Sequence, residues 1–202
     1  MSEDSQAKER KRASLAERFF IQSRRAVLWT LVSVVIGVVA FILLSIIPRP
    51  YLVIDLFKFG LWPAAAVITT VGSVRGSLAG LLTGYLGTLL YDLLVFSTVV
   101  SMSLDAVAFG IMGFIVGLVR YDFSRGRSLV KLSIVSAIGM LVAAVITLAV
   151  GLLVEVYADL VAIGFVVLPL LTVGVPTVFL LTPVFGWLVL SVSMRVPVST
   201  AK

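Results

Sequence analysis

Three connections between apolar stretches carry acids, a lysine and aromatic side chains that are able to bind a small molecule. The residues concerned are Asp55, Lys58, Trp62, Tyr91, Asp92, Asp105, Glu155 and Tyr157, with Tyr51, Phe57 and Asp159 beside them. A few polar anchors between aromatic walls suit a small planar ligand. Tyr and Trp also form the interfacial belts of membrane proteins, and acids in loops are commonly solvated, so that alternative stays open. The convergence of all three connections on one face favours a binding site.

Catalysis is not expected in this chain. Histidine and cysteine are absent, which excludes histidine bases, Ser–His nucleophiles and Cys/His metal sites. Asp92 and Asp105 form an acidic pair, but both lie too near the membrane edge for aspartyl intramembrane proteolysis. The stretch "GSVRGSLAG" lacks the Lys-Ser/Thr ending of a phosphate-binding loop. We therefore expect no catalytic residue, no cofactor and no metal, and energy for any active transport must come from a partner or an ion gradient.

The composition is that of an integral membrane protein. Of the 202 residues, 60% are hydrophobic and 13% are charged, whereas a soluble domain is about 45–50% apolar and about 25% charged. A membrane helix needs roughly 20 apolar residues. The expected fold is an all-α bundle of six transmembrane helices within a substrate-binding domain, 26–194. The expected spans are 26–47, 56–71, 75–96, 103–119, 132–154 and one within 160–194, whose final helix is expected to begin at Pro169.

The basic residues predict the orientation of this bundle. Six spans place both termini on one side, together with the connections near Arg75 and at 120–131. Of the 16 basic residues, Arg49 and Lys58 alone fall on the other side. Because Lys and Arg are enriched in cytoplasmic loops, both termini are expected to be cytoplasmic and the protein to lie in the plasma membrane. The net charge of +6 therefore reflects topology, and nucleic-acid binding is not expected.

The two ends of the chain are expected to be cytoplasmic segments. Residues 1–25 form a basic arm, and 195–202 form a short tail. Within the arm, "AERFFIQSRR" either lies along the membrane surface, with its apolar side chains inserted, or is part of a solvated tail. Both interpretations remain open.

Small residues form stripes on three of the expected helices. In the first helix they recur at steps of four and three, which keeps them on one face. Small residues let helices approach closely in lipid, so a stripe packs either inside the bundle or against a partner subunit. The first helix is the best candidate for docking a partner, through Ala26, Thr30, Ser33, Gly37 and Ala40. The third helix has Gly72, Gly76, Gly80 and Gly84 as a close-packing face, and the fourth has Gly110, Gly113 and Gly117.

The stretch "IPRPYLVIDLFKFGLWPAAAVITTVGSVRGSLAGLLTGYLGTLLYDLL" resembles the S components, which are the substrate-binding membrane subunits of energy-coupling-factor (ECF) vitamin transporters. Ile54, Asp55 and Leu56 resemble the outer loop of that family, the recurring glycines its third helix, and Asp92 the acid that ends this helix. "GIMGFIVGLVRYDFSRGR" is similar to the family's fourth helix and basic cytoplasmic loop. The chain departs from the family pattern at "GSVRG", which lacks a proline after its first glycine.

The resemblance implies a subunit that captures a vitamin or similar micronutrient from outside, under a closing first outer loop. A membrane coupling (T) subunit and two ATPase subunits would then drive uptake by toppling the bundle. The lack of histidine argues against the cobalt and nickel branch of the family. The outer acids suit a cationic ring such as thiamin, and the aromatic residues suit riboflavin, so a riboflavin-like or other B vitamin is expected. The alternative is a stand-alone secondary carrier or a structural membrane bundle.

Overall fold

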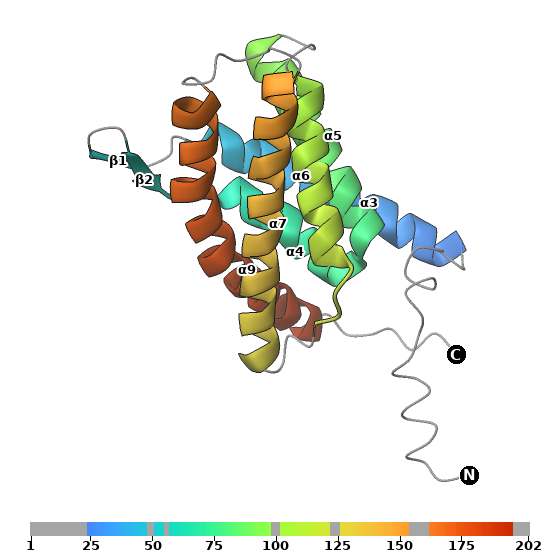
Figure 1. The fold of residues 1–202 in the computed structure, drawn as a ribbon. Coiled ribbons are helices and arrows are strands. Elements are labelled where there is room, and N and C mark those ends of the chain that lie inside the picture. The colour runs from blue at the N-terminus through green and yellow to red at the C-terminus, as the bar shows by residue number, and fades with distance from the viewer. Residues whose placement is uncertain are drawn as a thin grey trace, which may run out of the picture.

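The chain folds into a bundle of helices with one short β-hairpin. The structure is a computed structural model, and it describes residues 24–47, 51–54, 57–97, 102–121, 126–153 and 162–195. Within these residues the helices, labelled in Figure 1, are α3 (Arg24–Ile46), α4 (Pro63–Arg75), α5 (Ser77–Phe96), α6 (Met102–Gly117), α7 (Gly126–Leu153) and α9 (Val175–Arg195). Two π-helical stretches, η1 (Ala162–Val167) and η2 (Leu170–Gly174), lead into α9. The helical class expected from the sequence is confirmed.

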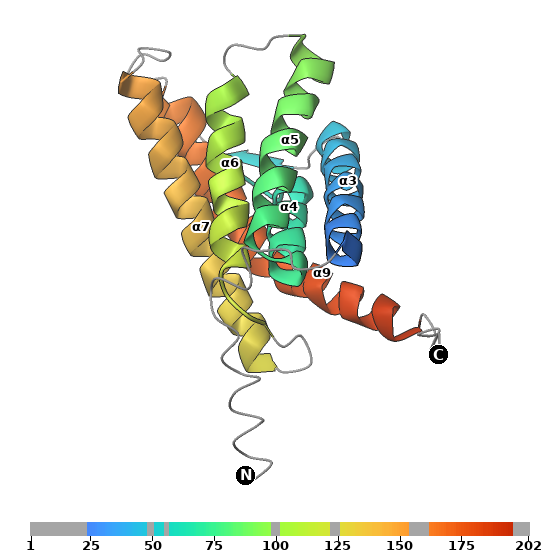
Figure 2. The ribbon, with the colours of Figure 1, turned by 90° about the vertical axis from the view of Figure 1, so that its right-hand side faces the viewer.

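The helices pack in two layers around α4. Figure 2 shows α7, α6, α5 and α3 side by side, with α4 and α9 behind them. The short helix α4 contacts α3, α5, α6 and α9, and its residues from Ala64 to Thr70 are all buried. Helix α9 closes the second layer by packing against α7 and α4. The core of the bundle therefore surrounds α4.

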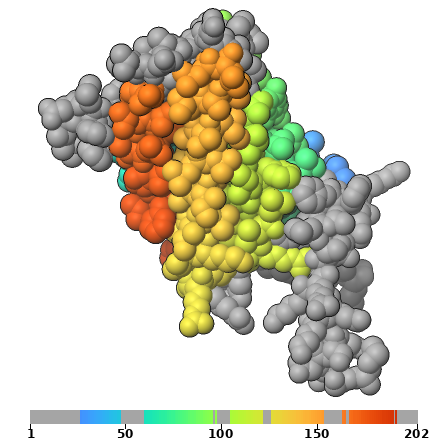
Figure 3. All heavy atoms as spheres, in the orientation of Figure 1, coloured from blue at the N-terminus to red at the C-terminus, as the bar shows by residue number. Residues whose placement is uncertain are grey.

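Four helices are long and apolar enough to cross a membrane, namely Val27–Ile46, Ser77–Val95, Gly126–Leu153 and Leu170–Val189. Their exposed side chains include many large apolar ones, as expected of helices that face lipid. On α7 these recur along one outer stripe, which consists of Val130, Ile134, Ile138, Leu141 and Val145. Figure 3 shows the outer surface of α7 along the length of the molecule. The structure therefore supports a membrane protein.

The other two helices are shorter. Helix α4 has 13 residues, about 20 Å at 1.5 Å per residue, against a hydrocarbon core of about 30 Å. The apolar part of α6, Asp105–Gly117, is also shorter than a full span. Length and composition thus single out four spans among the described residues.

The second helix begins later than the expected 56. Strands β1 (Tyr51–Ile54) and β2 (Phe57–Gly60) pair instead as an antiparallel hairpin, with Tyr51 opposite Gly60 and Ile54 opposite Phe57. Helix α4 starts at Pro63, because a proline has no amide hydrogen to lose in a first helical turn. The hairpin therefore takes the place of the first turns of the expected helix.

The fifth and last helices also differ from their expected bounds. Helix α7 already begins at Gly126 and includes Arg127 and Lys131, because charged residues are tolerated in a first turn that projects beyond the apolar layer. The last helical segment already begins at Ala162, and Pro169 lies between η1 and η2 rather than at the start of the final helix. A local widening of the helix to π geometry accommodates a proline in lipid.

Glycines make the contact between α5 and α6. A Cβ on Gly80 would overlap the carbonyl group of Gly113, and one on Gly84 would overlap that of Phe109. A Cβ on Gly72 of α4 would lie 2.6 Å from the carbonyl oxygen of Gly113. Gly80 and Gly84 thus form the close-packing face that their spacing predicts. The four expected glycines do not share one helix, however, because Gly72 belongs to α4 and Gly76, with a φ of 97°, separates α4 from α5. The backbones of Gly72, Gly80 and Gly113 meet.

Candidate functional site

Four aromatic rings from four separate segments meet inside the bundle. Phe41 comes from α3, Trp62 from the link between β2 and α4, Tyr91 from α5 and Phe109 from α6. The Phe41 ring lies edge to face with Trp62, at 5.9 Å between centroids, and with Tyr91, at 6.3 Å. Trp62 and Phe109 are edge to face at 5.2 Å. We call these four residues the aromatic cluster.

Hydrogen bonds and a glycine hold the aromatic cluster in place. The backbone N–H of Trp62 donates to the Thr177 hydroxyl of α9 at 2.7 Å, and this hydroxyl donates to the Val173 carbonyl at 2.6 Å. The Phe41 ring lies on Gly87, where an added Cβ would come within 3.1 Å of the ring. Helices α3, α5 and α9 therefore all fix the geometry of the cluster.

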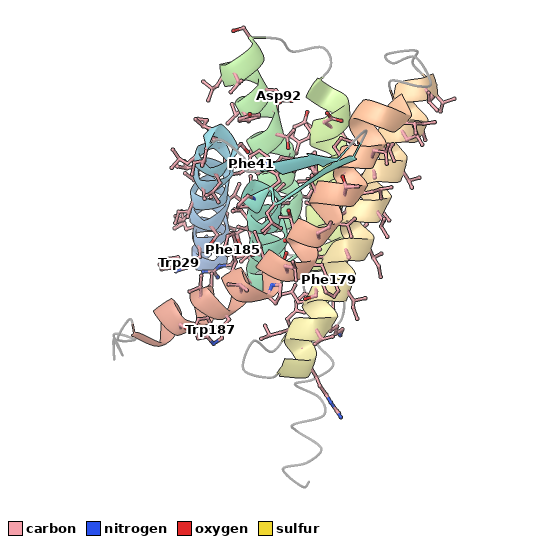
Figure 4. The ribbon with its side chains drawn as sticks, turned by 90° about the vertical axis from the view of Figure 1, so that its left-hand side faces the viewer. Trp29, Phe41, Asp92, Phe179, Phe185 and Trp187 are labelled. Carbon is pink, nitrogen blue, oxygen red and sulfur yellow. The ribbon has the colours of Figure 1, made fainter. Side chains whose placement is uncertain are left out.

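Two acids lie at the same end of the bundle as the aromatic cluster. Asp92 follows Tyr91 directly on α5, and Asp105 lies one turn before Phe109 on α6, on the same face of its helix. Both side chains are partly buried. The Asp105 carboxylate accepts a hydrogen bond from Thr147 of α7 and lies within electrostatic range of Asp92. Figure 4 shows Asp92 beyond Phe41, toward the end of the bundle that we call the acidic end.

The opposite end, which we call the basic end, holds every lysine and arginine whose side chain the structure describes. These are Arg75, Arg120, Arg127 and Lys131. The Arg75 guanidinium lies 5.8 Å from the ring centroid of Trp29, and its Nε donates to the Ser33 hydroxyl at 3.1 Å. Figure 4 shows Trp29 and Asp92 on opposite sides of Phe41 along the bundle. Acidic and basic side chains are thus separated along the bundle.

The structure brings together four of the predicted site residues, Trp62, Tyr91, Asp92 and Asp105. Lys58 is described by its backbone alone, which pairs with Val53 in the hairpin. The three other predicted residues lie outside the described residues; they are Asp55, Glu155 and Tyr157. The described part of the predicted site therefore comes from two of the three connections, the one that ends at Trp62 and the one between α5 and α6.

The stripe of small residues on α3 contacts the chain's own helices. A Cβ on Gly37 would lie 2.8 Å from the Thr83 and Val71 side chains. Ser33 accepts from Arg75 and donates to the Trp29 carbonyl at 2.7 Å. Thr30 and Ala40 are partly buried, and Ala26 is described by its backbone alone. Packing inside the bundle is thus confirmed for Gly37, Ser33 bonds to Arg75, and docking of a partner on this stripe stays a prediction.

Sequence reasoning missed three residues of the site, Phe41, Phe109 and Thr147. Phe41 continues the series Ser33–Gly37 at the same step of four, so helical spacing could have placed it on the inward face. Phe109 likewise follows Asp105 by four residues. No comparable pattern singles out Thr147, because nothing in the sequence specifies which face of α7 meets α6.

The site combines aromatic rings with acids and hydroxyls. Among the residues that the structure describes, no group of three or more acids could hold a metal ion. Apolar rings with two acids and several hydroxyls can bind a planar molecule through stacking and hydrogen bonds. Comparisons of the chain with protein-family models, with curated proteins and with solved structures found no match.

Proposed function

We propose that this chain is the substrate-binding membrane subunit of an ECF-type vitamin transporter and that it binds its ligand at the aromatic cluster. The observation that carries the proposal is the convergence of Phe41, Trp62, Tyr91 and Phe109 beside two acids at one end of the bundle. Aromatic walls with a few polar anchors are the usual lining of small-molecule sites. The expected ligand is a small planar molecule such as a B vitamin.

The proposed topology has six transmembrane spans, with both termini on the cytoplasmic side of the plasma membrane. The acidic end then faces outward, where the ligand arrives. The gathering of the described basic side chains at the other end supports this orientation. Helices α4 and α6 would complete the six spans as shorter members that are covered by their neighbours.

The hairpin connects the first outer segment to the site. Strand β2 ends at Gly60, two residues before Trp62, whose ring packs on Phe41 and Phe109. A movement of the hairpin would therefore reach the aromatic cluster through Trp62. In the proposed mechanism this segment closes over the bound ligand.

Uptake in this proposal depends on partners. A membrane coupling subunit and two ATPase subunits would supply the energy, and this chain would catalyse nothing. Docking of the coupling subunit on the small residues of α3 stays a prediction, and within this stripe Gly37 already packs against Thr83 and Val71.

Purification of the protein in mild detergent tests the proposal. Mass spectrometry of released ligands should detect one vitamin, and that vitamin should raise the thermal unfolding temperature. Trp62→Ala should lose this shift, while Trp187→Ala, which changes an exposed tryptophan, should retain it. Absence of any vitamin, together with no shift across a vitamin panel, would contradict the proposal. Uptake of the vitamin into vesicles that lack ATPase subunits would favour a stand-alone carrier.

A further inference from the structure

We propose that the ligand is positively charged and that Asp92 and Asp105 receive its charge beside the hydroxyl of Thr88. This inference rests on the proposed function, because it specifies the charge of the molecule that the same site binds. It depends on the packing of α5 on α6, on one buried hydroxyl, and on the distribution of charge along the bundle.

The packing of α5 on α6 places Thr88 level with Asp105. The two helices are antiparallel, and Gly80 lies against Gly113 while Gly84 lies against Phe109. A step of four residues forward on α5 therefore corresponds to a step of four backward on α6. The next step brings Thr88 opposite Asp105. One turn beyond Thr88, on the same face of α5, is Asp92.

The Thr88 hydroxyl is buried. Thr88 is only 5% exposed, and its Oγ1 has no hydrogen-bond partner among the described residues. Buried hydroxyls normally have a partner. A polar group of a ligand bound between Asp92 and Asp105 would provide one, because Thr88 stands at that level of the helix pair.

No described basic side chain neutralises the two acids. All four described lysine and arginine side chains lie at the basic end. Arg75 ends α4 next to the start of α5 at Ser77, and Asp92 lies 15 residues further along α5, about 22 Å at 1.5 Å per residue. Ionisable residues in a membrane bundle are costly, and they are candidate functional residues for that reason. A cationic ligand would place a positive charge beside the two acids.

The aromatic cluster also favours a cation. A positive charge over the face of Trp or Tyr is attracted by the ring, more strongly when water is excluded. Tyr91 is adjacent to Asp92, and Trp62 contacts Phe109 one turn from Asp105. The rings and the acids would therefore act on the same part of a bound cation.

Two pairs of probes test this inference on the full chain in lipid nanodiscs at pH 7. Pyridoxamine carries an ammonium group where pyridoxine carries a hydroxyl. Thiamin and riboflavin form a second pair, in which thiamin is the cation and riboflavin is neutral. Isothermal titration gives the Kd of each. We expect a cationic member to bind at least about tenfold more tightly than its neutral counterpart, equivalent to about 1.4 kcal/mol. Asp105→Asn and Asp92→Asn should each weaken that binding about tenfold or more.

Thr88→Val tests the hydroxyl, with Thr83→Val as its matched control on the same helix. Thr83 also has a buried hydroxyl without a partner among the described residues, but it packs against Gly37 of α3. We expect Thr88→Val to weaken cation binding several-fold and Thr83→Val to leave it unchanged.

The outcomes separate this inference from the proposed function. A neutral probe that binds as tightly as its cationic counterpart would overturn the inference while leaving vitamin binding in place. If the wild type and the two asparagine variants bind the cations equally well, the inference is overturned and vitamin binding again stays in place. If no probe of either charge binds, both the inference and the proposed function fail. The wild-type comparison of charged and neutral probes decides the matter even if a variant does not fold.

Discussion

Gly80 of α5 and Gly113 of α6 meet main chain to main chain, because a Cβ on either residue would overlap the carbonyl group of the other. Glycine costs about 1 kcal/mol relative to alanine inside a helix. In lipid, however, close backbone contact is a main source of helix association. The contact at Gly80 therefore accounts for a helix that is rich in a residue of poor helical propensity.

Gly80→Ala should destabilise the protein. The added methyl group has no space, and overpacking of this kind costs about 1–3 kcal/mol. Thermal unfolding in detergent, followed by size-exclusion chromatography, measures the effect. Gly164→Ala is the matched control, since a Cβ there meets nothing within 4 Å, and it should leave the unfolding temperature unchanged or raise it slightly. Equal effects of the two substitutions would contradict the close contact.

Thr83→Val and Thr88→Val should each stabilise the ligand-free protein. Both hydroxyls are buried without a hydrogen-bond partner among the described residues, and an unsatisfied buried polar group costs about 1–3 kcal/mol. Valine keeps the shape of the side chain and removes that cost. The free energy of unfolding in a denaturing detergent titration measures the change. A loss of stability in both variants would show that the hydroxyls have partners.

Quenching by brominated acyl chains should distinguish the three tryptophans. Trp29 and Trp187 are 59% and 54% exposed, and Trp62 is partly buried and packs against the core. In lipid vesicles, the Trp29→Phe/Trp187→Phe variant, which retains Trp62, should be quenched less than the Trp62→Phe variant. Stronger quenching of Trp62 than of the other two would place the cluster at the lipid surface and contradict the structure.

Thr69 of α4 and Thr182 of α9 should be coupled energetically. Their hydroxyl oxygens lie 2.7 Å apart, and Thr69 also donates to the Ala66 carbonyl at 3.0 Å, which makes Thr182 the donor between the two helices. Bonds of this kind between membrane helices contribute about 0.6 kcal/mol on average. A double-mutant cycle with Thr69→Val and Thr182→Val measures the coupling. Additive effects would mean that no such bond forms.

Single cysteines introduced at the two ends of the bundle should be accessible from opposite sides of the membrane. The chain has no cysteine of its own, so each introduced thiol is unique. In intact cells, a membrane-impermeant maleimide should label Ser97→Cys at the acidic end and should label Arg127→Cys at the basic end only after the cells are opened. Both residues are exposed. The reverse pattern would invert the proposed orientation.

Hydropathy and spacing predict most of the helical layout because both act locally. The first and third helices, α3 and α5, begin and end close to the expected positions, since each is one long apolar run between polar residues. The glycine stripes of α5 and α6 likewise follow from a spacing of three and four.

The differences arise where pairing with another segment decides the structure. The stretch from Tyr51 to Gly60 is apolar enough for a helix, but its two halves pair with each other. The same limit applies to predicting the site residues from the sequence. Asp92 and Asp105 were predicted from their charge in an apolar chain, whereas Thr147 belongs to the site only because α7 packs on α6.

The glycine contact also determines which parts of this protein are able to move. Helices whose main chains interlock cannot slide or rotate against each other without a collision, so α5 and α6 must travel as a single rigid body. Two of the four rings, Tyr91 and Phe109, are carried by that body, and Phe41 and Trp62 are carried by segments outside it. Entry of the proposed ligand between the rings would therefore separate Tyr91 and Phe109, which move together, from Phe41 and Trp62.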